Sequence, residues 1–585
     1  MRLFNIFFLF VVFASFCVSC GTGSDEPADG ALRPAEGGKF YGGIFRINES
    51  EYIKNLFPHN ITDAYSYRVA SQVYEGLFRF DPENLNVTKS LVDDFSVDES
   101  GTIYTFKIKK GVFFHDNPCF ADGKGREVTS QDVAYCFTQL CTRSINNQHF
   151  SIFDEVLKGA RAHYDASSNG NKPSFGVEGI RLIDDYTFEL HLLKPNALFT
   201  VNLAQPACFI YPKEAEEKYG VDMRINAVGT GPFSLNIADV EEDISIILKR
   251  NPNYHVKDNA GNRLPFVDAV SIQFIKDKKT ELFEFRKGNL DMIYRLPTEY
   301  IIEILEETMP GADGEYSQFQ LQRSPEMMTQ FLSLNNQSGV FKDKNVRKAF
   351  NFAIDRTKIL DFVLNGEGYA PGNHGITPPV FSNYNIEDIK GYSINIDSAQ
   401  HFLKKAGYPN GSGFPKLKFL LNAEGERNTN VAVEIKKQLM DHLNIDVELQ
   451  ILPFAQLLEK SYSGDYSLLR AAWVADFPSA ENFLWLFSSK DVPNSSTDAS
   501  YPNVARYVNS TFDAYYESAL KAKSIDAANE LFKKAEIRLM QDAPIIILWY
   551  DEGYRLIKSY VKDFPNNPMQ YRDLGRVYFE EAETL

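Results

Sequence analysis

A chain of 585 residues is too long for one hydrophobic core, so we expect several domains. Its net charge of −17 disfavours nucleic acid as a partner, because no excess of basic side chains offsets the repulsion of phosphates. Aromatic residues are plentiful, with 46 Phe and 30 Tyr. We interpret most of these rings as core and some as candidates for lining an apolar ligand cleft.

The N-terminus predicts export and a lipid anchor. Arg2 precedes an apolar run over residues 3–16 that is too short to span a membrane, so residues 1–19 are predicted to be a signal peptide. The segment Cys17-Val-Ser-Cys20-Gly21 resembles a bacterial lipobox, although Cys17 stands where leucine is usual. We therefore expect cleavage before Cys20 and a lipid on its thiol, with residues 20–38 as a flexible tether. The predicted location is the cell envelope, as a periplasmic or outer-face lipoprotein, and no later stretch is apolar enough to span a bilayer.

The first part of the body is predicted to be rich in strands. Residues 102–108 alternate between apolar and polar side chains, which is typical of a half-buried strand. Thr129 or Ser130 is expected to cap a helix that follows. The segment Gly229-Thr-Gly-Pro-Phe233 is interpreted as a tight turn, because it lacks the lysine of a phosphate-binding loop. Other strands are expected at 40–47, 180–193, 244–250, 269–275 and 291–293, and helices at 65–78 and 280–288.

After residue 325 helices and strands alternate. Residues 343–354 have Val346, Phe350 and Ala353 on one face, so an amphipathic helix is expected there. Alternation at this spacing indicates βαβ units and a largely parallel sheet. The other expected helices are 355–364, 398–406, 428–442 and 526–540, and the expected strands are 330–335, 417–421, 447–452, 543–550 and a short one over 571–579.

These patterns predict two α/β lobes and an insertion. Lobe I is assigned to 39–79, 227–325 and 545–585, a strand-rich insertion to 80–226, and lobe II to 326–544. A chain that leaves one lobe and returns to it crosses between the lobes at least twice. Such crossings can form a hinge around a cleft.

One acidic residue stands out. A strand-like apolar run from Arg470 ends at Asp476, and no basic residue follows closely. A carboxylate at the tip of a buried strand is unfavourable unless a cation meets it. We therefore expect Asp476 to receive the positive end of a ligand; a helix N-cap or an internal ion pair is the alternative.

The sequence carries no sign of a catalytic or metal site. It contains no zinc-protease, serine-hydrolase, phosphate-loop or dinucleotide-binding motif, so no enzyme is predicted, and no cofactor or metal site. His115 and Asp116 are adjacent on a predicted strand and face opposite ways, so a structural role is favoured. Four cysteines have irregular spacing without a CxxC pair, which argues against zinc and leaves disulfides open: Cys119, Cys136, Cys141 and Cys208.

Several stretches in order across about residues 40–560 together resemble the extracellular solute-binding proteins of family 5, which include the oligopeptide- and dipeptide-binding proteins of ABC importers. One departure is that His115-Asp116-Asn117 replaces the family's His-Asp-Gly. The matching stretches are Tyr74–Leu77, Tyr104–Phe106, Gly111–Asp116, Ser130–Val133, Gly229–Phe233, Arg250–Tyr254, Val346–Ala349, Ala353–Arg356, Ala406–Tyr408, and Trp473 with Asp476.

The resemblance implies a two-lobed periplasmic-binding-protein fold, type II of the large cluster C type, with an extra strand-rich subdomain. It also implies that Asp476 pairs with a peptide's α-amino group and that Arg470 meets the ligand's carboxylate. Trp473 and Ala475 complete the expected ligand-binding set, and Trp485 is expected to wall or support the cleft. If 470–476 is extended, Arg470 and Asp476 share a face, at most ~20 Å apart. For Arg470 a surface or inter-lobe salt bridge is the alternative.

The predicted function is that of a lipid-anchored substrate-binding component of an ABC importer. It would bind short peptides as a monomer and hand them to a permease and ATPase complex. The alternatives are a binder of a non-peptide solute, such as a nickel complex or an oligosaccharide, and a ligand-sensing surface protein of the same fold. A hydrolase is a third hypothesis, but no catalytic constellation supports it.

Overall fold

The computed structural model describes residues 32–580 except 172, 298–299, 310, 312, 382, 423–424 and 496–497. The predicted signal peptide, Cys20 and most of the predicted tether lie outside these residues. No helix in the described part of the chain is long and apolar enough to cross a membrane.

One sheet of eleven strands runs through the whole molecule, in the order β12-β13-β14-β3-β15-β21-β16-β20-β18-β19, with β17 paired to β21. The sequence predicted a largely parallel sheet after residue 325, but this sheet is mixed. Pairs such as β18–β19 are parallel, whereas β16 runs antiparallel to both β20 and β21. The strands are β3 (Ile44–Asn48), β12 (Phe233–Glu241), β13 (Ser245–Arg250), β14 (Ala269–Gln273), β15 (Met292–Tyr294), β16 (Phe319–Leu334), β17 (Ala370–Pro371), β18 (Leu417–Asn422), β19 (Val447–Leu452), β20 (Leu468–Val474) and β21 (Ile545–Lys558).

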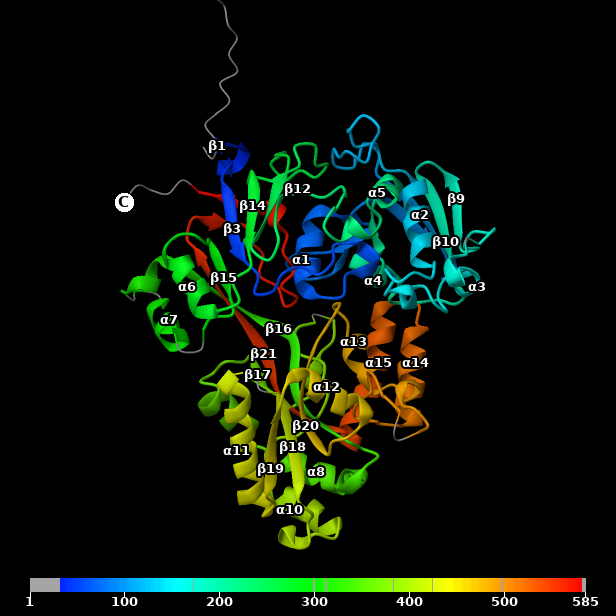
Figure 1. Ribbon diagram of the computed structural model, residues 1–585. Coiled ribbons are helices and arrows are strands. Elements are labelled where there is room, and N and C mark those ends of the chain that lie inside the picture. Colours follow the sequence, from blue (N-terminus) through cyan, green and yellow to red (C-terminus); the bar gives the residue numbers. More distant parts are fainter. Residues whose placement is uncertain are drawn as a thin grey trace, which may run out of the picture.

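Strands β16 and β21 connect an upper part and a lower part of the molecule (Figure 1). The upper part contains β1–β15 and α1–α7, and the lower part contains β17–β20 and α8–α15. Residues 319–325 of β16 pair with 552–558 of β21, and residues 329–333 pair with 545–550. The register shifts between Pro325 and Thr329. The antiparallel pairing arises because the chain descends along β16 and returns along β21.

The upper part also holds a four-stranded antiparallel sheet, β7-β8-β10-β9. Rings from Phe78, Phe95, Phe106 and Phe188 pack together on it. The helix predicted near Thr129 is confirmed as α2, and Thr129 and Asp132 form a capping box. The elements here are β7 (Val92–Val97), β8 (Ile103–Ile108), β9 (Ile180–Asp184), β10 (Thr187–His191), α1 (Ala64–Val73), α2 (Ser130–Leu140), α3 (Ala160–Ala166), α4 (Phe199–Asn202), α5 (Lys213–Tyr219), α6 (Lys278–Arg286) and α7 (Ile301–Glu307).

In the lower part, helices cover the sheet. The predicted amphipathic helix is confirmed as α8, which buries Val346, Phe350 and Ala353. The helices are α8 (Lys344–Ala353), α9 (Arg356–Lys358), α10 (Ile396–Lys405), α11 (Gly425–Leu443), α12 (Phe454–Ser463), α13 (Glu481–Leu484), α14 (Ser510–Leu520) and α15 (Ile525–Asp542). Two-stranded sheets complete the fold: β1 (Arg33–Pro34) with β2 (Phe40–Tyr41), β4 (Glu75–Gly76) with β11 (Phe209–Ile210), β5 (Phe78–Phe80) with β6 (Val87–Lys89), and β22 (Val561–Lys562) with β23 (Tyr578–Phe579).

Candidate ligand-binding site

Strand β20 leads to Asp476 and has one open edge. It pairs along its length with β16, but with β18 only at Leu468 and Leu469. The Ala475 N–H donates to the Met327 carbonyl oxygen (2.9 Å). Because backbone groups alternate sides along a strand, those of Ala472 and Val474 point away from β16. No strand among the described residues pairs with them there.

Side chains at this open edge are accessible. Ala472 and Asp476 are exposed, and the apolar Val474 is 58% exposed. Proteins usually protect apolar strand edges, because an unpaired edge recruits another extended chain. This edge can therefore accept an extended segment by strand addition.

Asp476 has no ion pair with any lysine, arginine or histidine of the described chain. Its backbone N–H donates to Asn482 Oδ1 (3.1 Å). Burial raises the pKa of the Asp476 carboxyl, and a hydrogen bond from Asn482 and the nearby His149 ring offset this only in part. His149 belongs to the upper part, so the carboxyl of Asp476 in the lower part lies within electrostatic reach of the upper part. The negative charge of Asp476 is therefore only partly offset by its neighbours.

A second acid lies close to Asp476. Burial raises the pKa of Glu481 to about 7; a hydrogen bond from Tyr516 opposes the rise and the negative charge of Asp476 adds to it. No lysine, arginine or histidine of the described chain forms an ion pair with either acid, and two neighbouring carboxyl groups favour binding of a positive group.

Asn482 holds the acid and a tryptophan together. Its Oδ1 accepts from Trp473 Nε1 (2.9 Å) as well as from the Asp476 N–H, and the residue is only 1% exposed. Asn482 was not among the site residues predicted from the sequence. The only signal was an amide six positions after the acid, in an otherwise aromatic segment.

Arg470 occupies a different environment from Asp476. It is 8% exposed, its Nη2 donates to Gln330 Oε1 (2.8 Å), and its guanidinium lies 5.7 Å from the centre of the Trp549 ring. Gln330 in turn donates to Asp551, which also accepts from Arg427 (3.1 Å). The structure therefore brings Asp476 and Trp473 together through Asn482, and places Arg470 in a buried polar network. The fourth predicted residue, Ala475, is buried, and its N–H is bonded to Met327 of β16.

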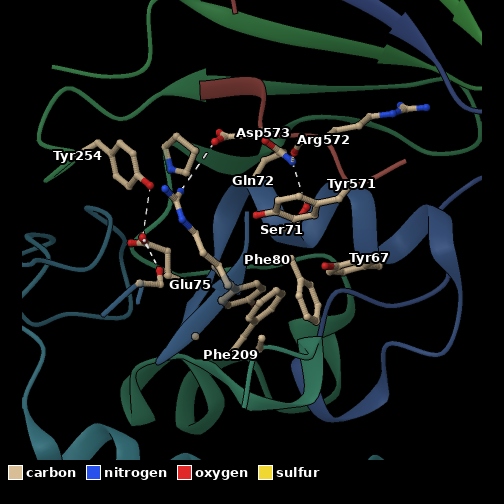
Figure 2. A pocket seen from close by; sticks show the side chains of 16 residues that line it. Tyr67, Ser71, Gln72, Glu75, Phe80, Phe209, Tyr254, Tyr571, Arg572 and Asp573 are labelled. Atoms are coloured by element: carbon tan, nitrogen blue, oxygen red, sulfur yellow. Dashed lines mark hydrogen bonds and ion pairs between the residues drawn. The ribbon is translucent and has the colours of Figure 1, made fainter. Parts of the chain in front are cut away.

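A polar cavity in the upper part is too small for a solute. Its volume is about 30 Å³, which is room for one or two waters. Burial would raise the pKa of Glu75 at this cavity, but hydrogen bonds and charge from His255 and Thr230 lower it to about 2. Figure 2 shows Glu75 beside Tyr254, whose hydroxyl donates to it (3.3 Å). The negative charge of Glu75 is therefore already balanced by groups within the chain. No group of three or more metal-ligating side chains occurs in the described residues.

Residues 86–495 match the family described as bacterial extracellular solute-binding proteins, family 5. The chain belongs to this family. The resemblance inferred from the sequence is thereby confirmed, and a family of solute-binding proteins is a family of binders rather than enzymes.

Relatives of this family-5 protein carry differing names. The periplasmic oligopeptide-binding protein OppA of Salmonella typhimurium is 26% identical over 558 residues, with 94% of each chain covered. The probable deoxycholate-binding periplasmic protein YgiS of Escherichia coli is 25% identical over 555 residues, also with 94% of each covered. Haem-binding protein A of Haemophilus influenzae is 25% identical over 531 residues, with 88% of each covered.

Solved structures of similar fold confirm the predicted two-lobed periplasmic-binding-protein class. The family-5 protein aligns with HbpA2 from Haemophilus parasuis with a TM-score of 0.74 at 21% identity, covering 92% of this chain and 100% of that one. It aligns with DppA from Helicobacter pylori, solved with the peptide STSA, with a TM-score of 0.71 at 24% identity, covering 92% and 99%.

Proposed function

We propose that this family-5 protein is the lipid-anchored substrate-binding component of an ABC importer and binds short peptides between its lobes. The observation that carries the proposal is Asp476, an anion without an ion-pair partner in the described chain, at the end of an open strand edge. The names of several relatives, which are oligopeptide- or dipeptide-binding proteins, support the same ligand class.

In this proposal an extended peptide adds to the open edge of β20. The backbone N–H and C=O groups of Ala472 and Val474 form hydrogen bonds with the peptide main chain. These bonds do not depend on the peptide's sequence. The peptide's α-ammonium lies at Asp476, with Glu481 adding negative charge when ionised. Hydrogen bonds between charged groups are roughly twice as strong as neutral ones, so this end fixes the peptide's register.

Arg470 is proposed as the partner of the ligand's carboxylate. Its place on the same strand, at most ~20 Å from Asp476, suits a short zwitterion. Gln330 and the Trp549 ring hold its guanidinium in one orientation. Arg470→Lys would keep the charge and lose the planar fork, so peptides with a free carboxylate should lose affinity while C-amidated peptides should not.

Closure over the ligand is the proposed motion. The lobes are those assigned from sequence: 39–79, 227–325 and 545–585 for lobe I, 80–226 as its insertion, and 326–544 for lobe II. The register shift between Pro325 and Thr329 provides a place where β16 and β21 can bend. Closing would bring His149 and the upper part over Asp476 and remove water from the ammonium.

Lipid attachment at Cys20 and delivery to a permease and ATPase complex are the remaining parts of the proposal. The lipobox-like segment before Cys20 and the periplasmic names of relatives support them. Mass spectrometry of the mature protein tests the anchor. Cys20→Ser should abolish the lipid mass and release the protein from membranes.

Calorimetry with free and blocked peptides tests the binding mode. Di- to pentapeptides with a free amine should bind at least ~10-fold more tightly than their N-acetylated versions, since one charged hydrogen bond contributes ~1.5–3 kcal/mol. Equal affinity of blocked and free peptides would contradict the proposed pairing of Asp476 with the peptide's α-ammonium.

A non-peptide solute is the second candidate, because relatives of similar identity are named for haem and deoxycholate. Mass spectrometry of small molecules released from the purified protein separates the two. Peptides favour the first proposal, and a single apolar metabolite favours the second.

A further inference from the structure

Four aromatic rings form a continuous row beside Asp476. Trp473 and Trp485 meet edge-to-face with centroids 6.4 Å apart, Trp485 and Tyr501 at 6.2 Å, and Tyr501 and Tyr462 at 5.3 Å. We call these four residues the ring row.

The ring row presents apolar surface to solvent close to the acid. Tyr501 is 52% exposed, and Trp473, Trp485 and Tyr462 are partly exposed. The ring row is tied to the acid through Asn482, whose Oδ1 accepts from both Trp473 Nε1 (2.9 Å) and the Asp476 N–H (3.1 Å).

The loop that carries Tyr501 is held in place. Arg506 is 2% exposed and donates to the carbonyl oxygens of Tyr462 (3.1 Å) and Asp498 (2.7 Å). The Ser500 N–H donates to the Tyr462 carbonyl (2.9 Å). The side-chain amide of Asn503 donates to the carbonyl oxygens of Ser488 and Tyr507. The ring row is thus a preorganised wall, which binds at a lower entropic cost than a loop that must order.

We infer that the ring row receives the side chain of the ligand's first residue, so that the protein selects peptides beginning with an aromatic residue. The inference rests on the proposed function. The ammonium and the first side chain leave the same Cα atom, so an ammonium at Asp476 brings that side chain near the ring row, which begins at Trp473 on the same strand. Ring–ring contacts favour an aromatic group there, and Asp476 and Glu481 repel an acidic one.

Calorimetry with four free-amine tripeptides tests this: Phe-Ala-Ala, Ala-Ala-Ala, Lys-Ala-Ala and Asp-Ala-Ala. Phe-Ala-Ala should bind ~10-fold or more tightly than Ala-Ala-Ala, and Asp-Ala-Ala should bind most weakly. Tyr501→Ala should cut the Phe advantage to ~3-fold or less while leaving Ala-Ala-Ala nearly unchanged. Tyr501→Phe keeps the ring and should keep the preference.

Phe283→Ala is the matched control, because Phe283 is an exposed ring on α6 of the upper part. It should leave all four affinities unchanged. Equal binding of Phe-Ala-Ala and Ala-Ala-Ala, or tightest binding of Lys-Ala-Ala, would overturn the inference. N-acetyl-Phe-Ala-Ala distinguishes the two failures: if acetylation still weakens binding, only the inference is wrong, and if it does not, the proposed function is wrong as well.

Discussion

At the scale of single residues, the proposed function depends most on the Asp476 carboxylate. It is exposed, lies near a second acid and has the neutral amide of Asn482 as its neighbour, but no ion-pair partner in the described chain. A cationic group bound at Asp476 would supply the charge partner that the described chain does not provide. Structural ion pairs elsewhere in the chain, such as Arg46 with Asp291 (2.7 Å), show what a satisfied carboxylate looks like here.

Asp476→Asn should therefore lower peptide affinity ~10- to 100-fold, because it keeps the shape and removes the charge. Calorimetry with a free-amine tripeptide measures the loss. Asp441→Asn, at an exposed acid paired with Lys437 on α11, is the control and should bind normally. Equal loss in both variants would point to a general charge effect instead.

Glu481 should make stability depend on pH. Its pKa is about 7 in the folded protein, against about 4.3 in an unfolded chain. Between about pH 4 and 7 the folded protein therefore keeps Glu481 protonated, whereas the unfolded chain releases this proton. Because the unfolded state binds fewer protons, the free energy of unfolding falls as pH rises from about 4 to 7. Urea unfolding at several pH values should show a shallower fall for Glu481→Gln than for the wild type. Identical slopes would mean that Glu481 titrates normally.

At the scale of elements, Asn482 at the start of α13 ties β20 to the helix. Asn482→Leu keeps the volume but leaves the Trp473 Nε1–H without its acceptor. The free energy of unfolding should fall by ~1–3 kcal/mol and peptide affinity should fall as well, since Asp476 loses its support. Urea unfolding followed by tryptophan fluorescence, with calorimetry, measures both. A variant that is destabilised but binds normally would show that Asn482 serves the fold alone.

Elements with strong local patterns were predictable from the sequence. The apolar stripe of α8 and the capping residues of α2 depend on neighbours within two turns, and both are confirmed. The pairing of β16 with β20 was not predictable, because it joins Leu332 to Arg470 across a long stretch of chain. That pairing decides which edge of β20 is open and which of its backbone groups are unpaired. The buried setting of Arg470 depends on Trp549 and Gln330, which arrive from two other strands.

At the scale of the whole molecule, β16 and β21 connect the two parts (Figure 1). Gly553 of β21 pairs with Ser324 of β16 and has little free space: a Cβ there would be 2.7 Å from Glu326 Oε1 and 3.1 Å from a Tyr294 ring atom. Glu326 is buried and paired with Arg295 (2.7 Å), which restrains its carboxylate from moving aside, so Gly553→Ala should lower the free energy of unfolding by ~1–3 kcal/mol. Thermal melting measures this. Gly176→Ala, where a Cβ would meet nothing within 4 Å, should be neutral or slightly stabilising.

Ligand binding should stabilise and compact the molecule. A peptide at 100 times its Kd should add ~2.7 kcal/mol to the free energy of unfolding by mass action. If the lobes close, small-angle scattering should show a smaller radius of gyration with peptide than without, at an unchanged molecular mass. Stabilisation without compaction would support binding but contradict closure.

The two-part architecture was predictable from the change in pattern near residue 325. The mixed character of the sheet was not, because strand direction in the centre is set by two long strands that pair with each other over residues 319–333 and 545–558. Local sequence carries no information about that mutual alignment.

The most direct test of the account is a crystal structure of the protein with a free-amine tripeptide. We predict the peptide extended along the open edge of β20, with its ammonium nitrogen within about 3.2 Å of an Asp476 carboxylate oxygen. An ammonium held by another group, or a peptide bound away from β20, would contradict it.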